Sequence, residues 1–409
     1  MKIGIYINQS SSAGGGFYEA IGSTKNFEGS GLEYEYFSSN RDSFNFLKKS
    51  GVHVNFIRLR HIDRFFLFLR RSILNFVAKL IPGNVIPVKI LSKIFRKYNR
   101  FEKKFINSGI DLVYFSSPEP NAVYLENLNF IITVWDLAHR ELPFFPELRK
   151  SLCFEARDHF YKSVLPKAYA IIVGHELARE QLKYFYNQRS EKIFVIPFRP
   201  SLKIVEFEAK FLHSDKIARP EELPAEYIYY PAQYSAHKSH ASLINAIYIL
   251  NKKRHLKVSL VFTGGDKGNL LFLKSKVQEL GLQKYVKFLP FQTDFEVYRI
   301  FKNAKAMVMP SFIGPGTLPT LEAMYLKIPF LVPDFASFRK YYANSCIYFD
   351  IFDEQDLANK IEFLLASKKT VSSLVDAATY KYEEIRDNSE IDLLNSHLKN
   401  FKYYLESYK

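Results

Sequence analysis

The chain has 409 residues, a length typical of two domains and too long for a peptide or a small disulfide-rich protein. Hydrophobic residues make up 47% and charged residues 24%, which excludes an intrinsically disordered chain. The two cysteines, Cys153 and Cys346, exclude a disulfide framework and favour a reducing compartment, so we expect a cytoplasmic protein.

The positive charge is concentrated in one part of the chain. The net charge is +15, and the segment Arg58–Lys104 alone holds thirteen basic and two acidic residues, a surplus of eleven. No apolar run approaches the roughly 18 residues of a membrane-spanning helix. The N-terminus alternates like a strand, so no secretory signal is expected.

Short β-branched or aromatic runs alternate with helix-length segments along the whole chain, which predicts βαβ units and mainly parallel sheets. The strands expected in the first half are Ile3–Asn8, Leu32–Phe37, Val52–Leu59, Asp111–Phe115, Phe130–Trp135, Ala170–Val173 and Lys192–Pro197. Those expected in the second half are Tyr227–Ala232, Lys257–Thr263, Val286–Phe291, Ala306–Pro310, Phe330–Pro333 and Cys346–Phe349. The stretch Pro200–Pro224 lacks this rhythm and is the predicted domain junction, so two doubly wound α/β domains are expected to face each other across a cleft.

A loop rich in glycine follows the first strand, in Ser10–Tyr18. The consecutive Gly14, Gly15 and Gly16 allow a ligand to approach the backbone closely and leave N–H groups free. The run does not match the G-x-G-x-x-G dinucleotide fingerprint, and a flexible loop is the commoner outcome for such a run taken alone.

The clearest candidate site lies in Met307–Met324. A buried strand is expected to end at Pro310, a Gly/Pro loop turns the chain, and a helix starts near Pro319. Free N–H groups and the helix dipole there suit a diphosphate, and Glu322, one turn inside the helix, could accept hydrogen bonds from the hydroxyls of a ribose. An ordinary βα turn with a solvated glutamate is the alternative.

The block Pro319–Met324 with Leu326–Leu331 resembles the nucleotide-sugar signature of glycosyltransferase family 4. Three further segments agree in order and spacing with that family: Tyr229–His240, Val261–Asp266 and Val134–Arg140. The resemblance covers nearly the whole chain. It implies a GT-B fold of two Rossmann-like domains, with an acceptor-side domain over residues 1–205, a nucleotide-sugar domain over 206–385, and a C-terminal helix over 386–409 that crosses back.

The resemblance also implies residue roles. Lys238 would neutralise the donor diphosphate, and Glu322 would hold the ribose of the nucleotide. Six further residues would surround the donor in two loops, namely Gly264, Gly265, Gly314, Gly316, Thr317 and Leu318. His139 would donate a hydrogen bond to the sugar or the acceptor, Asp136 would orient its loop, and Gly14, Gly15 and Gly16 would line the cleft. A surface histidine and a solvated lysine at a helix start are the alternatives for His139 and Lys238.

Two departures from the family pattern concern the donor site. The first carboxylate of the E-x7-E motif is absent, because its position is held by Gly314. The phosphate-binding arginine expected near Ala232 or Gln233 is also absent. Lys238 and the loop amides would then carry more of the phosphate charge, or Arg299 or Lys302 would reach in.

The basic segment Arg58–Lys104 has two interpretations of similar weight. Within Arg64–Leu80, the apolar residues repeat at helical spacing between arginines and lysines. This pattern fits a helix packed on its own domain or an interfacial helix on an anionic membrane surface. No nucleic-acid module accompanies the charge, so nucleic acid is not expected as a partner.

Taken with the resemblance, these features imply a retaining transferase that moves a sugar from a nucleotide-diphosphate donor to a hydroxyl of a glycan or lipid-linked glycan. Surface polysaccharide or lipopolysaccharide assembly is the expected context. No cofactor or metal is expected beyond the donor, because the chain has no Asp-x-Asp and no His/Cys cluster with ligand spacing. A nucleotide-sugar epimerase on the same fold and a non-catalytic nucleotide-sugar-binding scaffold are the alternatives.

Overall fold

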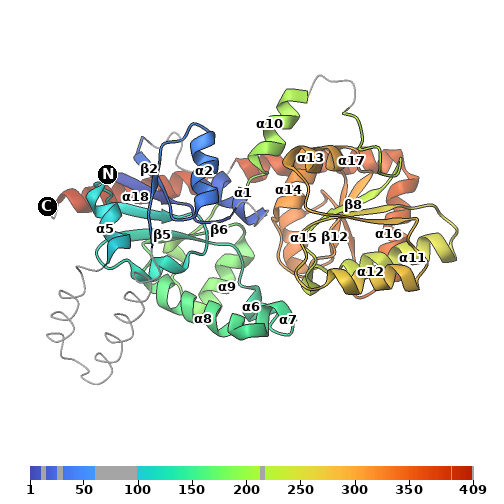
Figure 1. Ribbon diagram of the computed structural model, residues 1–409, viewed down its shortest axis with the longest axis horizontal. Coiled ribbons are helices and arrows are strands. Elements are labelled where there is room, and N and C mark those ends of the chain that lie inside the picture. Colours follow the sequence, from blue (N-terminus) through green and yellow to red (C-terminus); the bar gives the residue numbers. More distant parts are fainter. Residues whose placement is uncertain (11–14, 25–30, 60–98, 212–216, 388, 408–409) are drawn as a thin grey trace.

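A computed structural model describes residues 1–10, 15–24, 31–59, 99–211, 217–387 and 389–407. Two α/β domains lie side by side along the long axis of the molecule (Figure 1). Each is built on a parallel sheet, as the alternation of strands and helices predicts. Gly14 and residues 60–98 of the basic segment lie outside the described residues.

The N-terminal domain contains a seven-stranded sheet in the order β3-β2-β1-β4-β5-β6-β7, with every neighbouring pair parallel. Its strands are β1 (Lys2–Tyr6), β2 (Glu33–Ser38), β3 (Val54–Phe56), β4 (Leu112–Phe115), β5 (Asn129–Val134), β6 (Ala170–Val173) and β7 (Ile193–Val195). The central strands β4 and β6 are buried along their whole length, because helices cover both faces of the sheet.

Helices of the N-terminal domain enclose two apolar cores, one on each face of the sheet. The α-helices are α1 (Gly15–Gly22), α2 (Arg41–Lys49), α5 (Arg100–Asn107), α6 (Ala138–Glu141), α7 (Pro146–Arg149), α8 (Cys153–Val164) and α9 (Glu176–Tyr186). Short 3₁₀ turns are η3 (Pro120–Tyr124), η4 (Lys150–Leu152), η5 (Leu165–Lys167) and η6 (Ser190–Lys192). Helix α1 packs on one face through Phe17 and Ala20, and α5 packs on the other through Phe101 and Phe105.

The C-terminal domain contains a six-stranded parallel sheet in the order β10-β9-β8-β11-β12-β13. Its strands are β8 (Ile228–Pro231), β9 (Leu260–Thr263), β10 (Val286–Leu289), β11 (Ala306–Val308), β12 (Phe330–Pro333) and β13 (Ile347–Phe349). Around them lie α10 (Leu202–Phe211), η7 (Ala236–Lys238), α11 (His240–Tyr248), η8 (Ile249–Lys253), α12 (Leu270–Glu279), α13 (Asp294–Lys302), α14 (Leu318–Tyr325), α15 (Ala336–Tyr342), α16 (Glu354–Ala366) and α17 (Lys368–Arg386).

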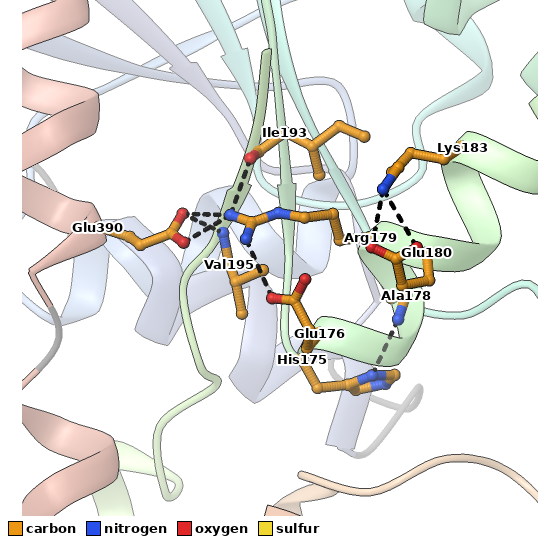
Figure 2. Close-up of polar contacts among 9 residues, drawn as sticks. All are labelled: His175, Glu176, Ala178, Arg179, Glu180, Lys183, Ile193, Val195 and Glu390. Carbon is orange, nitrogen blue, oxygen red and sulfur yellow. Dashed lines mark hydrogen bonds and ion pairs between the residues drawn. The ribbon is translucent and has the colours of Figure 1, made fainter. Parts of the chain in front are cut away.

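The last helix, α18 (Glu390–Ser407), runs back along the N-terminal domain (Figure 1). Its Leu394, Leu398 and Phe401 are buried in the N-terminal core, where each contributes about 1.5–3 kcal/mol of burial energy. Figure 2 shows the polar anchor at its start: Glu390 accepts two hydrogen bonds from Arg179, at 2.5 and 2.6 Å, and one from the Val195 N–H at 2.8 Å. Helix α18 is therefore tied to both α9 and β7.

The predicted strands are all present, and Ala170–Val173 and Phe330–Pro333 have the predicted bounds. The predicted boundary between residues 205 and 206 falls inside a helix. The junction Pro200–Pro224 was expected to be irregular, but α10 occupies its first half. Its Ile204, Phe207 and Phe211 belong to the C-terminal core, and Phe207 and Phe211 pack against Phe295 of α13. The N-terminal domain therefore ends before α10.

Candidate functional site

A cavity of about 600 Å³ lies between the two domains, at the carboxyl ends of their strands. This is the position where doubly wound sheets bind ligands, and the volume suits one small molecule. The N-terminal wall includes Gly15, Gly16, Trp135, Asp136 and Arg157. The C-terminal wall comes mainly from the loops after β8, β9, β10 and β11 and contains Gln233, Lys238, Gly264, Gly265, Gln292, Thr317, Leu318 and Glu322.

Lys238 provides a cation at the cavity, as the sequence predicts. It ends the 3₁₀ turn η7 after β8, and its Nζ lies 3.3 Å from Ser311 Oγ in the loop after β11. Burial lowers the pKa of Lys238 to about 8, although the charge of Asp136 works in the opposite direction. A bound anion would raise this pKa again, so the side chain is suited to neutralise a phosphate.

Glu322 also faces the cavity, from within α14. Its Oε1 accepts a 3.3 Å hydrogen bond from the Ser201 N–H, in the connection between the domains. Burial, assisted by the charge of the nearby Asp294, raises the pKa of Glu322 to about 7. Hydrogen bonds from hydroxyl groups would stabilise the charged carboxylate of this buried side chain and lower its pKa.

Glycines bring the backbone close to the cavity at two loops. A Cβ on Gly264 would lie 2.1 Å from the Ala232 carbonyl oxygen, so no side chain fits there. A Cβ on Gly265 would have no atom within 4 Å, and this residue opens directly onto the cavity. On the opposite wall a Cβ on Gly16 would lie 2.9 Å from the Trp135 ring, and one on Gly15 would meet Leu318 of the other domain at 3.2 Å.

The loop before α14 corrects two predictions. Gly316 was expected to offer its amide to a phosphate, but this N–H donates to Tyr342 Oη at 2.8 Å, and Gly316 is not among the lining residues. Gly316 has φ +71°, which favours glycine. Gly314 also lies off the cavity and packs against His175 of the N-terminal domain, where a Cβ would be 3.1 Å from Nε2. Thr317 and Leu318 do line the cavity.

His139 does not face the cavity in this structure, contrary to the expectation. It is fully buried in α6, where Nε2 lies 2.9 Å from Tyr186 Oη and the ring stacks on Tyr161. Burial, together with the charge of Arg157, lowers the pKa of His139 to about 4. The helical turn that follows Asp136 directs this side chain toward α8 and α9 instead of the cleft.

Asp136 lies at the cavity and is paired with Arg157, which the sequence analysis missed. The Arg157 Nη2 donates to Asp136 Oδ1 at 2.7 Å and to its carbonyl oxygen at 3.2 Å. Burial by itself raises the pKa of Asp136, but Arg157 and the Ala138 N–H together lower it below its usual range. Arg157 comes from α8, 21 residues further along the chain, and no local motif marks it.

Two further contacts that sequence reasoning missed join the domains at the cavity. The Tyr18 hydroxyl of α1 donates a hydrogen bond to Asp294, the first residue of α13. The carboxylate of Glu147 in α7 accepts from the His237 N–H at 2.9 Å, and its Oε1 lies 2.5 Å from His237 Nδ1. Tyr18, Asp294 and His237 all line the cavity, so domain contact and ligand site share residues.

The suggested substitutes for the missing arginine do not reach the cavity. Arg299 pairs with Glu296 and donates to the Ala218 carbonyl, whereas Lys302 pairs with Glu208 of α10. Both side chains point toward α10 and the segment after it. The lysines that the C-terminal domain contributes to the cavity wall are therefore the buried Lys238 and the exposed Lys267.

Within the described ranges, no group of three His, Cys, Asp or Glu side chains could hold a metal ion. Among the same residues, no helix combines the length and apolarity needed to cross a bilayer.

Residues 214–381 match the model of the family described as "Glycosyl transferases group 1". A comparison with curated proteins finds no match. Solved structures are similar over nearly the whole chain. Sucrose-phosphate synthase from Thermosynechococcus elongatus has 16% identity and a TM-score of 0.67, with coverage of 99% of this chain and 100% of that one.

HepE from Anabaena, solved in complex with UDP-glucose, has 14% identity and a TM-score of 0.63, covering 98% of this chain and 99% of its own. WaaG, a glycosyltransferase involved in lipopolysaccharide biosynthesis, has 12% identity and a TM-score of 0.62, covering 96% of this chain and 98% of its own. The fold is GT-B, and the family match falls on the C-terminal half of the cavity. The protein is a glycosyltransferase enzyme.

Proposed function

We propose that this enzyme is a retaining member of glycosyltransferase family 4 that transfers a sugar from a nucleotide-diphosphate donor to a hydroxyl of a glycan or lipid-linked glycan. The observation that carries the proposal is the joint placement of Lys238 and Glu322 on one cavity between the domains. Lys238 is a cation that suits the diphosphate of a donor, and the Glu322 carboxylate can accept hydrogen bonds from the hydroxyls of its ribose. The two residues follow neighbouring strands, so one donor could contact both. HepE, solved with UDP-glucose, supports a uridine nucleotide as the first donor to test.

In this proposal the C-terminal domain holds the donor. Lys238 lies against the diphosphate as a point charge and stabilises the charge that develops on it as the glycosidic bond breaks. Glu322 accepts hydrogen bonds from the ribose hydroxyls, and Thr317 and Leu318 contact the donor at the start of α14. Gly265 leaves room for the donor on the β9 side, because a side chain there would enter the cavity, and Gly264 lets the backbone pass close to the Ala232 carbonyl.

The acceptor approaches from the N-terminal wall formed by Gly15, Gly16 and the Asp136–Arg157 pair. The bond from the anomeric carbon to the diphosphate oxygen breaks, and the acceptor oxygen forms its bond on the same face. The departing diphosphate takes the acceptor's proton, so no protein nucleophile is required. Catalysis then consists of positioning, charge stabilisation and exclusion of water as the cleft closes.

Titration calorimetry with UDP, GDP and ADP tests donor binding, and proton NMR of the product from the matching nucleotide sugar tests retention. Retention gives a product with the donor's anomeric configuration. An inverted product contradicts the retaining mechanism, and failure to bind any nucleotide or nucleotide sugar contradicts the whole proposal. A protein that binds donors but neither hydrolyses nor transfers them is a scaffold instead. Full activity in EDTA is the expected result, because the proposal uses no metal.

WaaG, as a lipopolysaccharide enzyme, supports surface-glycan assembly as the context. We further propose a cytoplasmic protein whose basic segment Arg58–Lys104 associates with the anionic inner face of the membrane. Its surplus of eleven positive charges supports this, at about 1 kcal/mol for each basic residue near the surface. Cosedimentation with anionic and neutral vesicles at low and high salt tests it, and equal binding to both vesicles contradicts it.

A further inference from the structure

Four phenylalanine rings form a continuous row across the domain boundary, here called the aromatic row: Phe144, Phe145, Phe312 and Phe352. Ring centroids are 4.7 Å apart for Phe144 and Phe145, 5.2 Å for Phe145 and Phe312, and 5.7 Å for Phe312 and Phe352. The first two rings belong to the N-terminal domain and the last two to the C-terminal domain. The two ends of the row are strongly exposed, with Phe144 at 67% and Phe352 at 77%.

Such a row is unusual on a protein surface. Single exposed hydrophobic residues are common, but contiguous apolar surface usually marks a binding site. No part of the fold that the structure describes explains the exposed ends, since Phe144 precedes the short helix α7 and Phe352 lies in the turn between β13 and α16.

The aromatic row adjoins the donor cavity. Phe145 packs edge-on against His237, and the Phe312 N–H donates to the His237 carbonyl at 3.1 Å. Phe312 stands between Ser311, which contacts Lys238, and Ile313, which lines the cavity. A ligand that extends out of the cavity on this side would therefore lie along the row.

Charge along the row argues against a membrane as its occupant. Arg149 and Lys150 follow its N-terminal end, whereas the exposed carboxylates of Asp350 and Asp353 flank Phe352. An anionic bilayer would be attracted at one end and repelled at the other. A neutral polyhydroxylated ligand is compatible with both the basic and the acidic end of the row. Its C–H faces can cover phenylalanine rings, and its hydroxyls can donate hydrogen bonds to carboxylates.

We propose that the aromatic row is an extended subsite for an oligosaccharide acceptor, so that the enzyme acts on a glycan of several sugars. The inference rests on the proposed function, because a sugar chain reaches out of this cavity along the row only if the enzyme transfers to a glycan acceptor. The cavity of about 600 Å³ holds little beyond a donor and one acceptor sugar, and the remaining sugars would stack on the rings. Because the row crosses the domain boundary, a bound glycan would also favour the closed arrangement.

The test uses the full chain and the double variant Phe144→Ala/Phe352→Ala, whose exposed side chains can be removed without opening the core. Saturation-transfer NMR and calorimetry are run with maltohexaose, isomaltohexaose, cellohexaose and core oligosaccharide released from lipopolysaccharide. Wild type is expected to bind at least one of them, and the variant to bind it about tenfold more weakly or worse. UDP affinity and hydrolysis of the donor without acceptor are expected to stay unchanged.

The control is Tyr184→Ala/Tyr380→Ala, which removes two strongly exposed aromatic side chains, at 83% and 76%, that lie outside the row. This variant is expected to bind the oligosaccharides like wild type. The inference is overturned if none of the four probes binds, if both double variants bind equally, or if Phe144→Ala/Phe352→Ala weakens binding to anionic vesicles instead. Donor binding separates the two proposals. If the wild-type protein binds no nucleotide sugar, the proposed function is refuted. If it turns over the donor but its binding of glycans does not depend on the aromatic row, only this subsite is refuted.

Discussion

The side chain of Lys238 makes the pH dependence of donor binding a sharp test of the site. In the free protein its pKa is about 8, below the ordinary value of 10.5, because the ammonium is buried. A diphosphate beside Lys238 favours the charged form of the side chain, so the pKa of Lys238 rises when a nucleotide binds. Above pH 8, binding of one nucleotide is therefore accompanied by uptake of one proton by Lys238. Affinity for UDP is therefore expected to fall about tenfold for each pH unit above 8.

The size of the charge effect follows from the same contact. Removing the ammonium in Lys238→Ala leaves the diphosphate without its charge-assisted partner, which costs about 2–4 kcal/mol, or roughly 30-fold to 1000-fold in kcat/KM. The variant is expected to lose the alkaline decline in UDP affinity. Lys238→Arg is the matched control, because a guanidinium stays charged throughout this range and should bind UDP without the decline.

Calorimetry of UDP binding from pH 6 to 9.5, in buffers of different ionisation enthalpy, measures both the affinity and the proton uptake. The reasoning is refuted if wild type and Lys238→Arg show the same pH profile, or if Lys238→Ala binds UDP as tightly as wild type. Circular dichroism of each variant across the same pH range shows that the fold is retained.

Three further outcomes are expected. Glu322→Gln should weaken UDP binding about tenfold or more and remove the pH dependence of affinity near pH 7, where burial places the pKa of Glu322; an unchanged profile in calorimetry would contradict its contact with the ribose. Tyr18→Phe removes the hydrogen bond to Asp294 across the domains and should lower kcat about tenfold while the Kd for UDP stays the same; a change in Kd alone would place Tyr18 at the donor instead. Stability should fall below pH 6.5, because burial lowers the pKa of His139 to about 4 and that of His240 to about 3, and the unfolded chain binds protons that the folded protein excludes. Each of these two histidines removes about 1.4 kcal/mol per pH unit between pH 6 and pH 4, so urea unfolding of His240→Gln should be less acid-sensitive than that of wild type, and identical pH profiles would refute the assignment.

The linear sequence was sufficient to predict the strands, although only Ala170–Val173 and Phe330–Pro333 have the predicted bounds. Runs such as Ala170–Val173 and Phe330–Pro333 are buried on both faces of a parallel sheet, so they are continuously apolar and bounded by turn residues. Because ligands bind at the carboxyl ends of such strands, the positions of Lys238 and Glu322 in the chain are enough to assign both residues to one cleft. The two-domain organisation follows from the same repetition of strand and helix.

Only the tertiary structure decided which way each side chain near the cleft turns. His139 and Asp136 are neighbours in one motif, yet the first helical turn after β5 buries the histidine and leaves the aspartate at the cavity. The Gly316 amide is taken by Tyr342, 26 residues away, and Arg157 reaches Asp136 from a different helix. Hydrogen bonds of this kind join positions that are distant in the chain, and local periodicity carries no information about which distant groups meet when the helices pack.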